Sequence, residues 1–340
     1  MMKRGDIGIW RISDNGEAFL LRRFAKEADA ENAWARLCER VGEHDRRYTL
    51  KTQYSYPPIT VPTVRERPHL FLGDLNSLGL LHLVLEVASN STDQFLMGFG
   101  TQVWIRLTDD GFEVEDDGAG FHRDKAKHVL THYHGMATAD NHAPHIHLSW
   151  SGVGVCPVNA VCSEFIVESY DKRGGWLQRY AKGVLVDESG VKHRAGTLVK
   201  ATFDRTILMG AFPRDLLRRK CFEAVHIIPG LRMSLDQETF YAPTGLLSLA
   251  EFDAAANLER PIAGHRRFGL NHDGEEIQFS IACLGETKNE TRLLSWVNGC
   301  RTEEHGTHVD GALEALGEFG WYPASLYLSV VMKEPEYAGP

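Results

Sequence analysis

Alternating and helically spaced apolar residues predict a small module at the start of the chain. Apolar and polar positions alternate over residues 7–12 and 18–24. The S-D-N-G sequence between them is a strong short-range signal for a β-hairpin. Residues 26–42 then show apolar positions at helical spacing, and residues 47–54 return as a third strand. We expect a ββαβ module over residues 1–54 that binds a partner, supports a dimer or extends the next domain.

An apolar helix carries the first candidate chemistry. The sequence L-H-L-V-L-E-V-A-S-N, which begins at Leu81, predicts a helix in which Glu86 and Asn90 share one face, with His82 one turn earlier. A carboxylate there can position and polarise a water for attack on a phosphoryl group. A neutral amide oxygen suits Mg²⁺, which keeps most of its own waters. The helix therefore fits ATP hydrolysis.

A hairpin follows the helix and ends in a glycine-rich turn. Residues 102–107 and 112–115 flank T-D-D-G, and the second strand runs into D-D-G-A-G. Asp116 at this strand end could accept a hydrogen bond from an adenine amino group. Gly118 and Gly120 would let the backbone approach the base.

Two further segments complete the pattern. S-G-V-G-V over residues 151–155 leads into a helical pattern that continues to Ser163, so its amide groups and the helix dipole would face phosphates. G-T-L-V over residues 196–199 places the Thr197 hydroxyl beside a strand. Each segment alone is more often a plain turn than a site. Their shared order, from helix and hairpin through loop and helix to strand, indicates a nucleotide pocket.

In this order the segments resemble the ATPase region of the DNA gyrase B and topoisomerase IV family. That family belongs to the superfamily of gyrase, heat-shock chaperone, histidine kinase and MutL ATPases (GHKL). The resemblance begins near Thr63 with V-R-E-R-P and Gly73, and it reappears as Asn298 and the G-T-H sequence. It implies an α+β chain: a Bergerat-type ATPase sandwich of mixed sheet and helices over residues 63–215, then a transducer-like α+β domain over residues 216–340.

The resemblance also implies roles for the candidate residues. Glu86 would be the general base, His82 its orienting neighbour and Asn90 the Mg²⁺ ligand. Asp116 and Thr197, at the strand ends, would bind adenine, partly through water. The glycine loop, with Gly152, Val153 and Gly154, would contact the phosphates. Because members of the family close as dimers on ATP, we expect a homodimer. The proline-rich linker over residues 55–62 could cross to the partner subunit.

The sequence departs from the family pattern at four positions around the pocket. The family commonly pairs a glutamate on the helix with an arginine in the glycine turn, whereas this chain has Gln94 and Ala119. Because both members change together, no buried charge is left without a partner. Ser89 stands where the family usually has aspartate, and Asp117 where it has asparagine.

The expected lid, residues 131–150, is rich in histidine and lacks the family's basic residues. Its histidines are His132, His134, His142, His145 and His147. One interpretation is a transition-metal site. No cysteine or carboxylate stands at tight ligand spacing, so we favour a moving loop whose histidines contact the triphosphate on closure.

The 340 residues contain no counterpart of the family's DNA-cleavage domain. The family's Q-T-K loop has no counterpart either, and Lys333 lies too early in its strand to be the Q-T-K lysine. We therefore expect an ATPase that is not a complete topoisomerase. Either its hydrolysis is slow, or a partner or one of His145, Arg179 and Lys182 supplies the positive charge. A third alternative is that the sequence is a fragment of a longer chain.

Composition and charge bear on the location of the protein, the state of its cysteines and its partners. No signal peptide or long apolar run is visible, so we expect a cytoplasmic protein without membrane contact. The six cysteines show no C-x-x-C spacing and predict reduced, mostly buried thiols. The net charge is −9, and after Cys221 acidic residues outnumber basic ones by about two to one. Such a surface disfavours DNA as a partner.

Three functions fit the sequence. The first is an ATP-hydrolysing clamp of the gyrase B type that dimerises on nucleotide. The second is an enzyme that uses ATP to activate a small molecule by phosphoryl or adenylyl transfer. The third is a regulator without catalysis that mimics the gyrase B subunit and binds or poisons it.

The charge distribution generates a first prediction. Added plasmid should change the rate of ATP hydrolysis little, because an acidic C-terminal region repels the DNA phosphates. The measurement is the ATPase rate against plasmid concentration at low salt, where electrostatic binding is strongest. Several-fold stimulation that disappears at high salt would contradict the prediction.

Overall fold

A computed structural model of the chain describes residues 7–12, 18–24, 27–41, 48–51, 60–133, 146–149, 154–171, 173–192, 195–257, 261–272, 275–332 and 335. The chain divides into two compact units, Met1–Ile59 and Thr60–Pro340.

The first unit is the small module predicted from the alternation of its residues. It contains, in order, β1 (Ile7–Ile12), β2 (Ala18–Phe24), α1 (Glu27–Val41) and β3 (Tyr48–Lys51). The strands pair antiparallel in the order β2-β1-β3. Buried Ile9 and Phe24 pack against Ala33, Trp34 and Leu37 of the helix. The described elements of this unit therefore follow one another in the order ββαβ.

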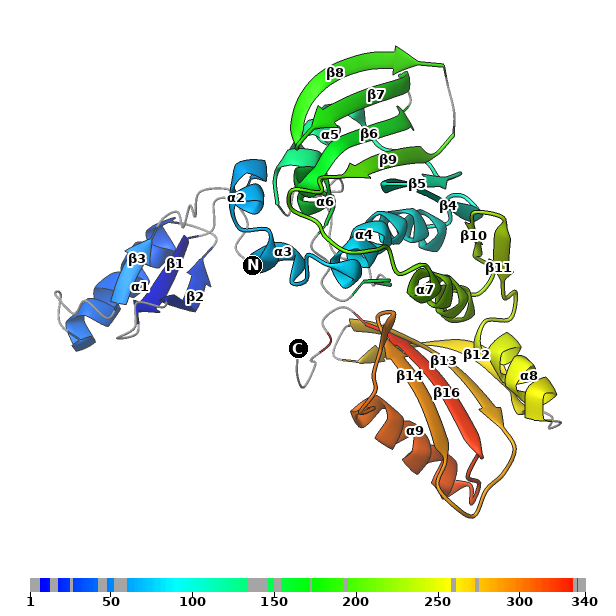
Figure 1. The fold of residues 1–340 in the computed structure, drawn as a ribbon. Coiled ribbons are helices and arrows are strands. Elements are labelled where there is room, and N and C mark those ends of the chain that lie inside the picture. Colours follow the sequence, from blue (N-terminus) through cyan, green and yellow to red (C-terminus); the bar gives the residue numbers. More distant parts are fainter. Residues whose placement is uncertain are drawn as a thin grey trace. The chain divides into compact units, whose positions relative to one another are not determined.

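The second unit is built around an eight-stranded mixed sheet (Figure 1). Its strand order is β11-β10-β4-β5-β9-β6-β7-β8. Within this sheet, as far as the structure describes it, β4 and β10 pair in parallel and the other neighbouring strands pair antiparallel. The strands are β4 (Gln102–Thr108), β5 (Gly111–Asp116), β6 (Cys162–Asp171), β7 (Gly174–Ala181), β8 (Val184–Val191), β9 (Thr197–Phe203), β10 (Arg232–Leu235) and β11 (Glu238–Tyr241).

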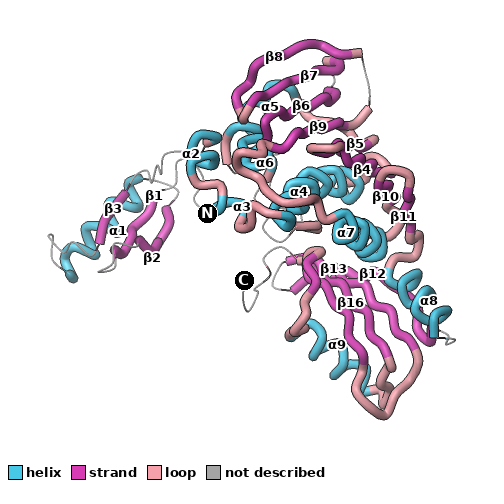
Figure 2. The backbone as a smooth tube through the Cα atoms, in the orientation of Figure 1, coloured by secondary structure: helices cyan, strands magenta, loops and turns pink. Residues whose placement is uncertain are grey.

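Helices gather beside this sheet, with α4 and α7 next to the strands β4, β5, β10 and β11 (Figure 2). The helices are α2 (Val61–Glu66), α3 (His69–Leu72), α4 (Ser77–Leu96), α5 (Arg123–Thr131), α6 (Val155–Val161) and α7 (Arg214–Ile227). The predicted helix with Glu86, the hairpin and the later strand are all present. Helix α6 ends two residues before Ser163, because Cys162 already begins β6.

The two faces of the large sheet differ in polarity. Val103 and Ile105 of β4 are buried, as are Phe112 and Val114 of β5. On the alternate positions, Arg106 forms ion pairs with glutamates of β5. This alternation with a period of two places the apolar side against α4 and leaves the charged side toward solvent.

A five-stranded sheet follows, in the order β12-β13-β16-β14-β15. It consists of β12 (Pro261–His272), β13 (Glu275–Leu284), β14 (Arg292–Val297), β15 (Cys300–Arg301) and β16 (Ser325–Val331), with α8 (Leu246–Asn257) and α9 (Thr307–Glu318). Leu328 and Val330 of β16 pack with Val309 of α9, whereas Tyr327 donates a hydrogen bond to Asp253 of α8 (2.5 Å). Because adjacent strand residues point to opposite faces, the two helices cover both sides of β16.

The large sheet continues beyond residue 215, where the sequence analysis places the end of the ATP-binding domain. Helix α7 packs on β10 and β11, and β10 pairs with β4 about 130 residues earlier in the chain. In the part of the chain that the structure describes, no helix is long and apolar enough to cross a membrane. All six cysteines are free thiols, and Cys156, Cys162, Cys221 and Cys283 are buried.

Candidate active site

Helix α4 buries a carboxylate in an otherwise apolar stretch. Leu83, Val84 and Leu85 are 0 to 2% exposed, and Glu86 is only 5% exposed. The Ser149 hydroxyl donates a short hydrogen bond to Glu86 Oε1. The backbone N–H of Gly154 donates to Oε2 at 2.9 Å. Both carboxylate oxygens therefore have the partners that burial demands.

His82 and Asn90 lie on the same helical face as Glu86. Burial lowers the pKa of His82, although Glu86 and Asp74 act against this, so the imidazole favours its neutral form. Asn90 is exposed, and its Nδ2 donates to the backbone oxygen of Glu86 at 3.1 Å. The side-chain oxygen of Asn90 is then the end of the amide that can meet a cation, which fits a Mg²⁺ ligand.

Asp116 closes the other end of the site at the end of β5. It is 6% exposed and accepts three hydrogen bonds, from Ser91 Oγ (2.8 Å), Gly118 N (2.9 Å) and Thr197 N (3.2 Å). Burial raises its pKa above the ordinary range in spite of these donors. Because Ser91 belongs to α4, the helix that carries Glu86 also fixes Asp116.

The glycine turn after Asp116 is required by close packing. Gly120 has φ +68°, and a Cβ there would lie 2.3 Å from the Tyr170 carbonyl oxygen. Beside it, Ser169 Oγ accepts from Phe121 N at 3.1 Å and lies 2.9 Å from Thr197 Oγ1. The structure thus brings together Asp116, the glycine turn and Thr197, as the sequence predicts.

The glycine loop before α6 is described only at its end. Gly152 and Val153 lie outside the described residues. Gly154 precedes α6 with φ +77°, and its N–H is used by Glu86. In the same helix, buried Asn159 donates to the Leu130 carbonyl oxygen (2.9 Å), which connects α6 to α5.

The four departures from the family pattern are accommodated by neutral or local hydrogen bonds. Ala119 N donates to Gln94 Oε1 at 3.1 Å, so the helix and the glycine turn stay connected without charge. Ser89 Oγ accepts from Leu148 N at 3.0 Å. Burial alone would raise the pKa of Asp117, but hydrogen bonds from Thr101 and the Gln102 N–H lower it.

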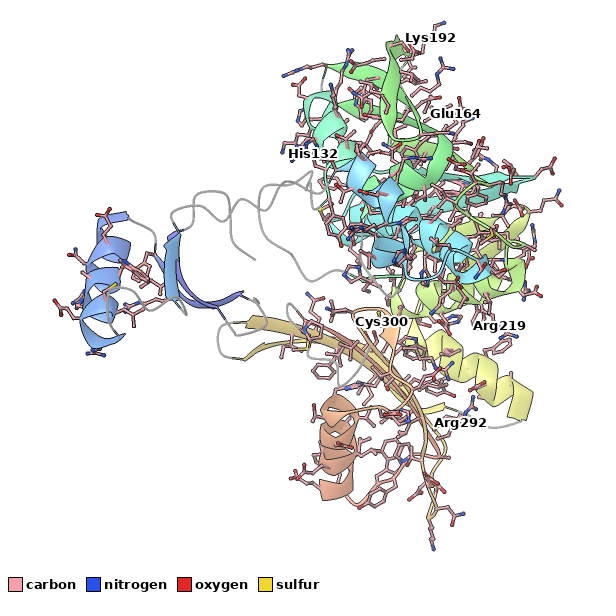
Figure 3. The ribbon with its side chains drawn as sticks, turned by 60° about the vertical axis from the view of Figure 1, so that its left-hand side comes forward. His132, Glu164, Lys192, Arg219, Arg292 and Cys300 are labelled. Carbon is pink, nitrogen blue, oxygen red and sulfur yellow. The ribbon has the colours of Figure 1, made fainter. Side chains whose placement is uncertain are left out.

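The histidines of the expected lid are only partly described. The rings of His128 and His132, one turn apart at the end of α5, stack with centroids 4.4 Å apart, and Figure 3 labels His132 there. His134, His142 and His145 lie outside the described residues. No group of three metal-ligating side chains occurs in the described segments.

The cations considered as charge stabilisers have local partners on the far strands of the sheet. Arg179 of β7 lies 3.9 Å from a carboxylate oxygen of Glu164. Lys182, in the turn after β7, lies 3.9 Å from Asp204. His145 lies outside the described residues.

Two residues of the site were missed by the sequence analysis. Asp93 stands three residues after Asn90 and seven after Glu86, so it shares their helical face. Its Oδ1 is buried and has no hydrogen-bond partner among the residues that the structure describes. Helical spacing alone could have identified Asp93. Ser149 could not be found this way, because its contact with Glu86 joins distant segments.

Comparisons with known proteins agree on one family. No family model matches the sequence. The DNA gyrase B protein of Helicobacter pylori is 28% identical over 270 residues, which are 73% of this chain and 34% of that protein. The DNA gyrase B protein of Chlamydia muridarum is 27% identical over 297 residues, 78% of this chain and 37% of that protein. The chain thus spans about a third of the length of these curated relatives.

Solved structures show the same fold. The ATPase domain of Thermus thermophilus gyrase B, in complex with an aminocoumarin, matches with a TM-score of 0.66 and 21% identity over 82% of both chains. The gyrase B protein of Myxococcus xanthus matches with a TM-score of 0.64 and 21% identity, over 82% of this chain and 88% of that one. The resemblance and the α+β fold expected from the sequence are confirmed. The chain therefore resembles the gyrase B ATPase region in sequence and in fold.

The burial of Asp93, whose Oδ1 has no hydrogen-bond partner among the described residues, generates a prediction about pH. Burial raises its pKa to about 7 in the folded protein, against about 4 in an unfolded chain. Asp93 therefore contributes stability below pH 4, and this contribution is lost as the pH rises through 7. Asp93→Asn should remove the loss and stabilise the protein at pH 8 by on the order of 1–4 kcal/mol.

The measurement is denaturant unfolding of both proteins between pH 4 and 8, without nucleotide. Asp124→Asn is the control, because Asp124 is an exposed carboxylate whose side chain keeps 64% of its accessible surface. Superimposable pH profiles of the wild type and Asp93→Asn would refute the assignment.

Proposed function

We propose that this relative of the gyrase B ATPase region binds ATP with Mg²⁺ and hydrolyses it with Glu86 as general base. The observation that carries the proposal is the position of helix α4. Its Glu86 contacts the start of α6 through Gly154, and its Ser91 contacts Asp116 at the end of β5. One rigid helix therefore fixes the two ends of a single site, for phosphates and for the base.

Asp116 is the proposed acceptor for the adenine amino group. A carboxylate offers about four lone-pair directions, and the described donors to Asp116 are one hydroxyl and two N–H groups. One direction then remains for a ligand. Thr197 Oγ1 lies in the same network, which supports its proposed contact with adenine, in part through water.

Asn90 is proposed to hold Mg²⁺, and Gly152, Val153 and Gly154 to contact the phosphates. The cation would neutralise charge on the phosphates and shape them for in-line attack. Glu86 would orient a water and take its proton, while His82 beside it stays neutral. Gly154 N–H already contacts Glu86, so this backbone group lies next to the reacting end of the site.

We also propose that the chain acts in the cytoplasm as a nucleotide-dependent homodimer. The support is the likeness to gyrase B and topoisomerase IV proteins in sequence and fold.

The adenine assignment is tested by Asp116→Asn. The amide puts a donor where the adenine amino group also donates, so ATP affinity should fall about tenfold or more. Isothermal calorimetry of the full chain with Mg²⁺ and ATP measures it. Asp117→Asn serves as the control. The Asp117 carboxylate is next to Asp116 in the sequence, but it accepts hydrogen bonds from Thr101 and Gln102 and is not proposed to contact adenine. Equal affinity of wild type and Asp116→Asn would show that adenine binds elsewhere.

The base assignment is tested by Glu86→Gln. The amide keeps the shape of the side chain and an oxygen for Gly154 N–H, and the Ser149 hydroxyl can turn to accept from the amide. ATP affinity should stay within a few-fold, while turnover falls by about a hundredfold or more. Glu113→Gln, in an ion pair with Arg106 and Lys200 on the charged side of β5, is the matched control. Unchanged turnover in Glu86→Gln would move the base to another residue.

A further inference from the structure

Residues 146–149 form a short bridge between the five-stranded sheet and helix α4. On one side, His147 N donates to the Asn298 carbonyl oxygen at 2.8 Å. Cys300 Sγ lies 3.9 Å from the Ser149 carbonyl oxygen, a weak thiol contact. Figure 3 shows Cys300 at the end of the five-stranded sheet that meets the rest of the unit.

Gly299 shows how tightly this side is packed. Its φ is +86°, and a Cβ there would lie 2.4 Å from the His147 carbonyl oxygen and 2.5 Å from Ile146 Cγ2. Real Cβ atoms do not approach backbone oxygens so closely, so the turn accepts only glycine while residues 146–147 keep their place.

The turn over residues 298–300 is itself held firmly. Asn298 has φ +48°, a conformation that asparagine tolerates better than most residues. Its side chain exchanges two hydrogen bonds with the backbone of Met332, at 2.7 and 2.8 Å. Its N–H donates to the Val330 carbonyl oxygen at 2.8 Å. The position of the turn therefore follows the end of β16.

On the other side, the bridge reaches the proposed base. Leu148 N donates to Ser89 Oγ, and the Ser149 hydroxyl donates to the Glu86 carboxylate. Ser149 is 1% exposed and Glu86 5%, so water does not compete for this hydrogen bond. Four residues thus separate the turn of the five-stranded sheet from the base on α4.

We infer that Ser149 is a positioning residue for Glu86 and that the turn over residues 298–300 sets the place of Ser149. The inference rests on the proposed function of Glu86. A glutamate side chain has several rotamers of similar energy. The fixed hydroxyl selects the one in which Oε2 faces Gly154 N. Movement of the turn would shift Ser149 and release the carboxylate from this orientation.

Ser149→Ala tests whether Ser149 positions Glu86. ATP affinity should stay within a few-fold of wild type, while turnover falls about tenfold to a hundredfold, the scale of a slightly misplaced catalytic group. In the Glu86→Gln background, Ser149→Ala should lower turnover no further, because its effect acts through Glu86. Full additivity of the two changes would overturn the inference, since a purely structural role of Ser149 would add to any background.

Gly299→Ala tests whether the turn over residues 298–300 sets the place of Ser149. The added methyl group must displace residues 146–147, so turnover should fall as in Ser149→Ala, again with little change in ATP affinity. The two substitutions together should be no worse than either one. Gly311→Ala in α9 is the matched control, since a Cβ there meets nothing within 4 Å. Wild-type turnover in a folded Gly299→Ala variant would overturn the role of the turn.

Mass spectrometry after incubation with ATP and Mg²⁺ completes the test. Ser149 should stay unmodified. A phosphate on Ser149 would overturn the positioning role, because the hydroxyl would then be the acceptor of the phosphoryl group. The proposed function fails separately, if the wild type binds no ATP or if Glu86→Gln turns over normally. Tight ATP binding with normal turnover in Ser149→Ala would overturn only the positioning role.

Discussion

The burial of Glu86 in an apolar helix constrains the rest of the second unit. A carboxylate removed from water must find hydrogen-bond donors, or it destabilises the fold by several kcal/mol. Among the described residues two groups donate to Glu86, and both belong to the segment that leads into α6. The need to satisfy one side chain thereby fastens residues 146–149 and the start of α6 onto α4. Because α6 packs in turn against α2 and α5, the surroundings of the site are organised from this helix outward.

Helix α4 also donates a hydrogen bond to the buried carboxyl group of Asp116, through Ser91. Burial raises the pKa of this carboxyl group. Hydrogen bonds from the Ser91 hydroxyl and from two backbone N–H groups act against that rise. At the two positions where the gyrase B family commonly has a charged pair, this chain has neutral residues. Gln94 and Ala119 keep the contact between α4 and the glycine turn through one neutral hydrogen bond. Because neither side chain is charged, no single buried ion is left without a partner at this contact.

Local sequence signals predicted the local structure well. The Asn-Gly hairpin at the start, the helix with Glu86 and Asn90, and the hairpin ending in Asp116 all follow from period and turn chemistry. Long-range pairings could not be read in this way. Strand β10 joins β4 across about 130 residues, and His147 joins Asn298 across about 150. Such contacts depend on how whole elements pack. The hydrogen bond from Ser149 to Glu86 belongs to this class, whereas Asp93 was visible in the helical period.

The chemistry of the donors to Glu86 has a consequence for its proposed role. An ammonium or guanidinium partner would hold the carboxylate strongly but would also compensate its charge, which favours the ionised form and weakens it as a proton acceptor. The described donors to Glu86 are a hydroxyl and a backbone N–H, and both are neutral. They fix the direction of the carboxylate without placing a positive charge beside it. A hydroxyl can also rotate, so it can donate to the carboxylate and later accept from the protonated acid. A serine at residue 149 therefore suits the role proposed for Glu86, which requires a carboxylate held in one orientation.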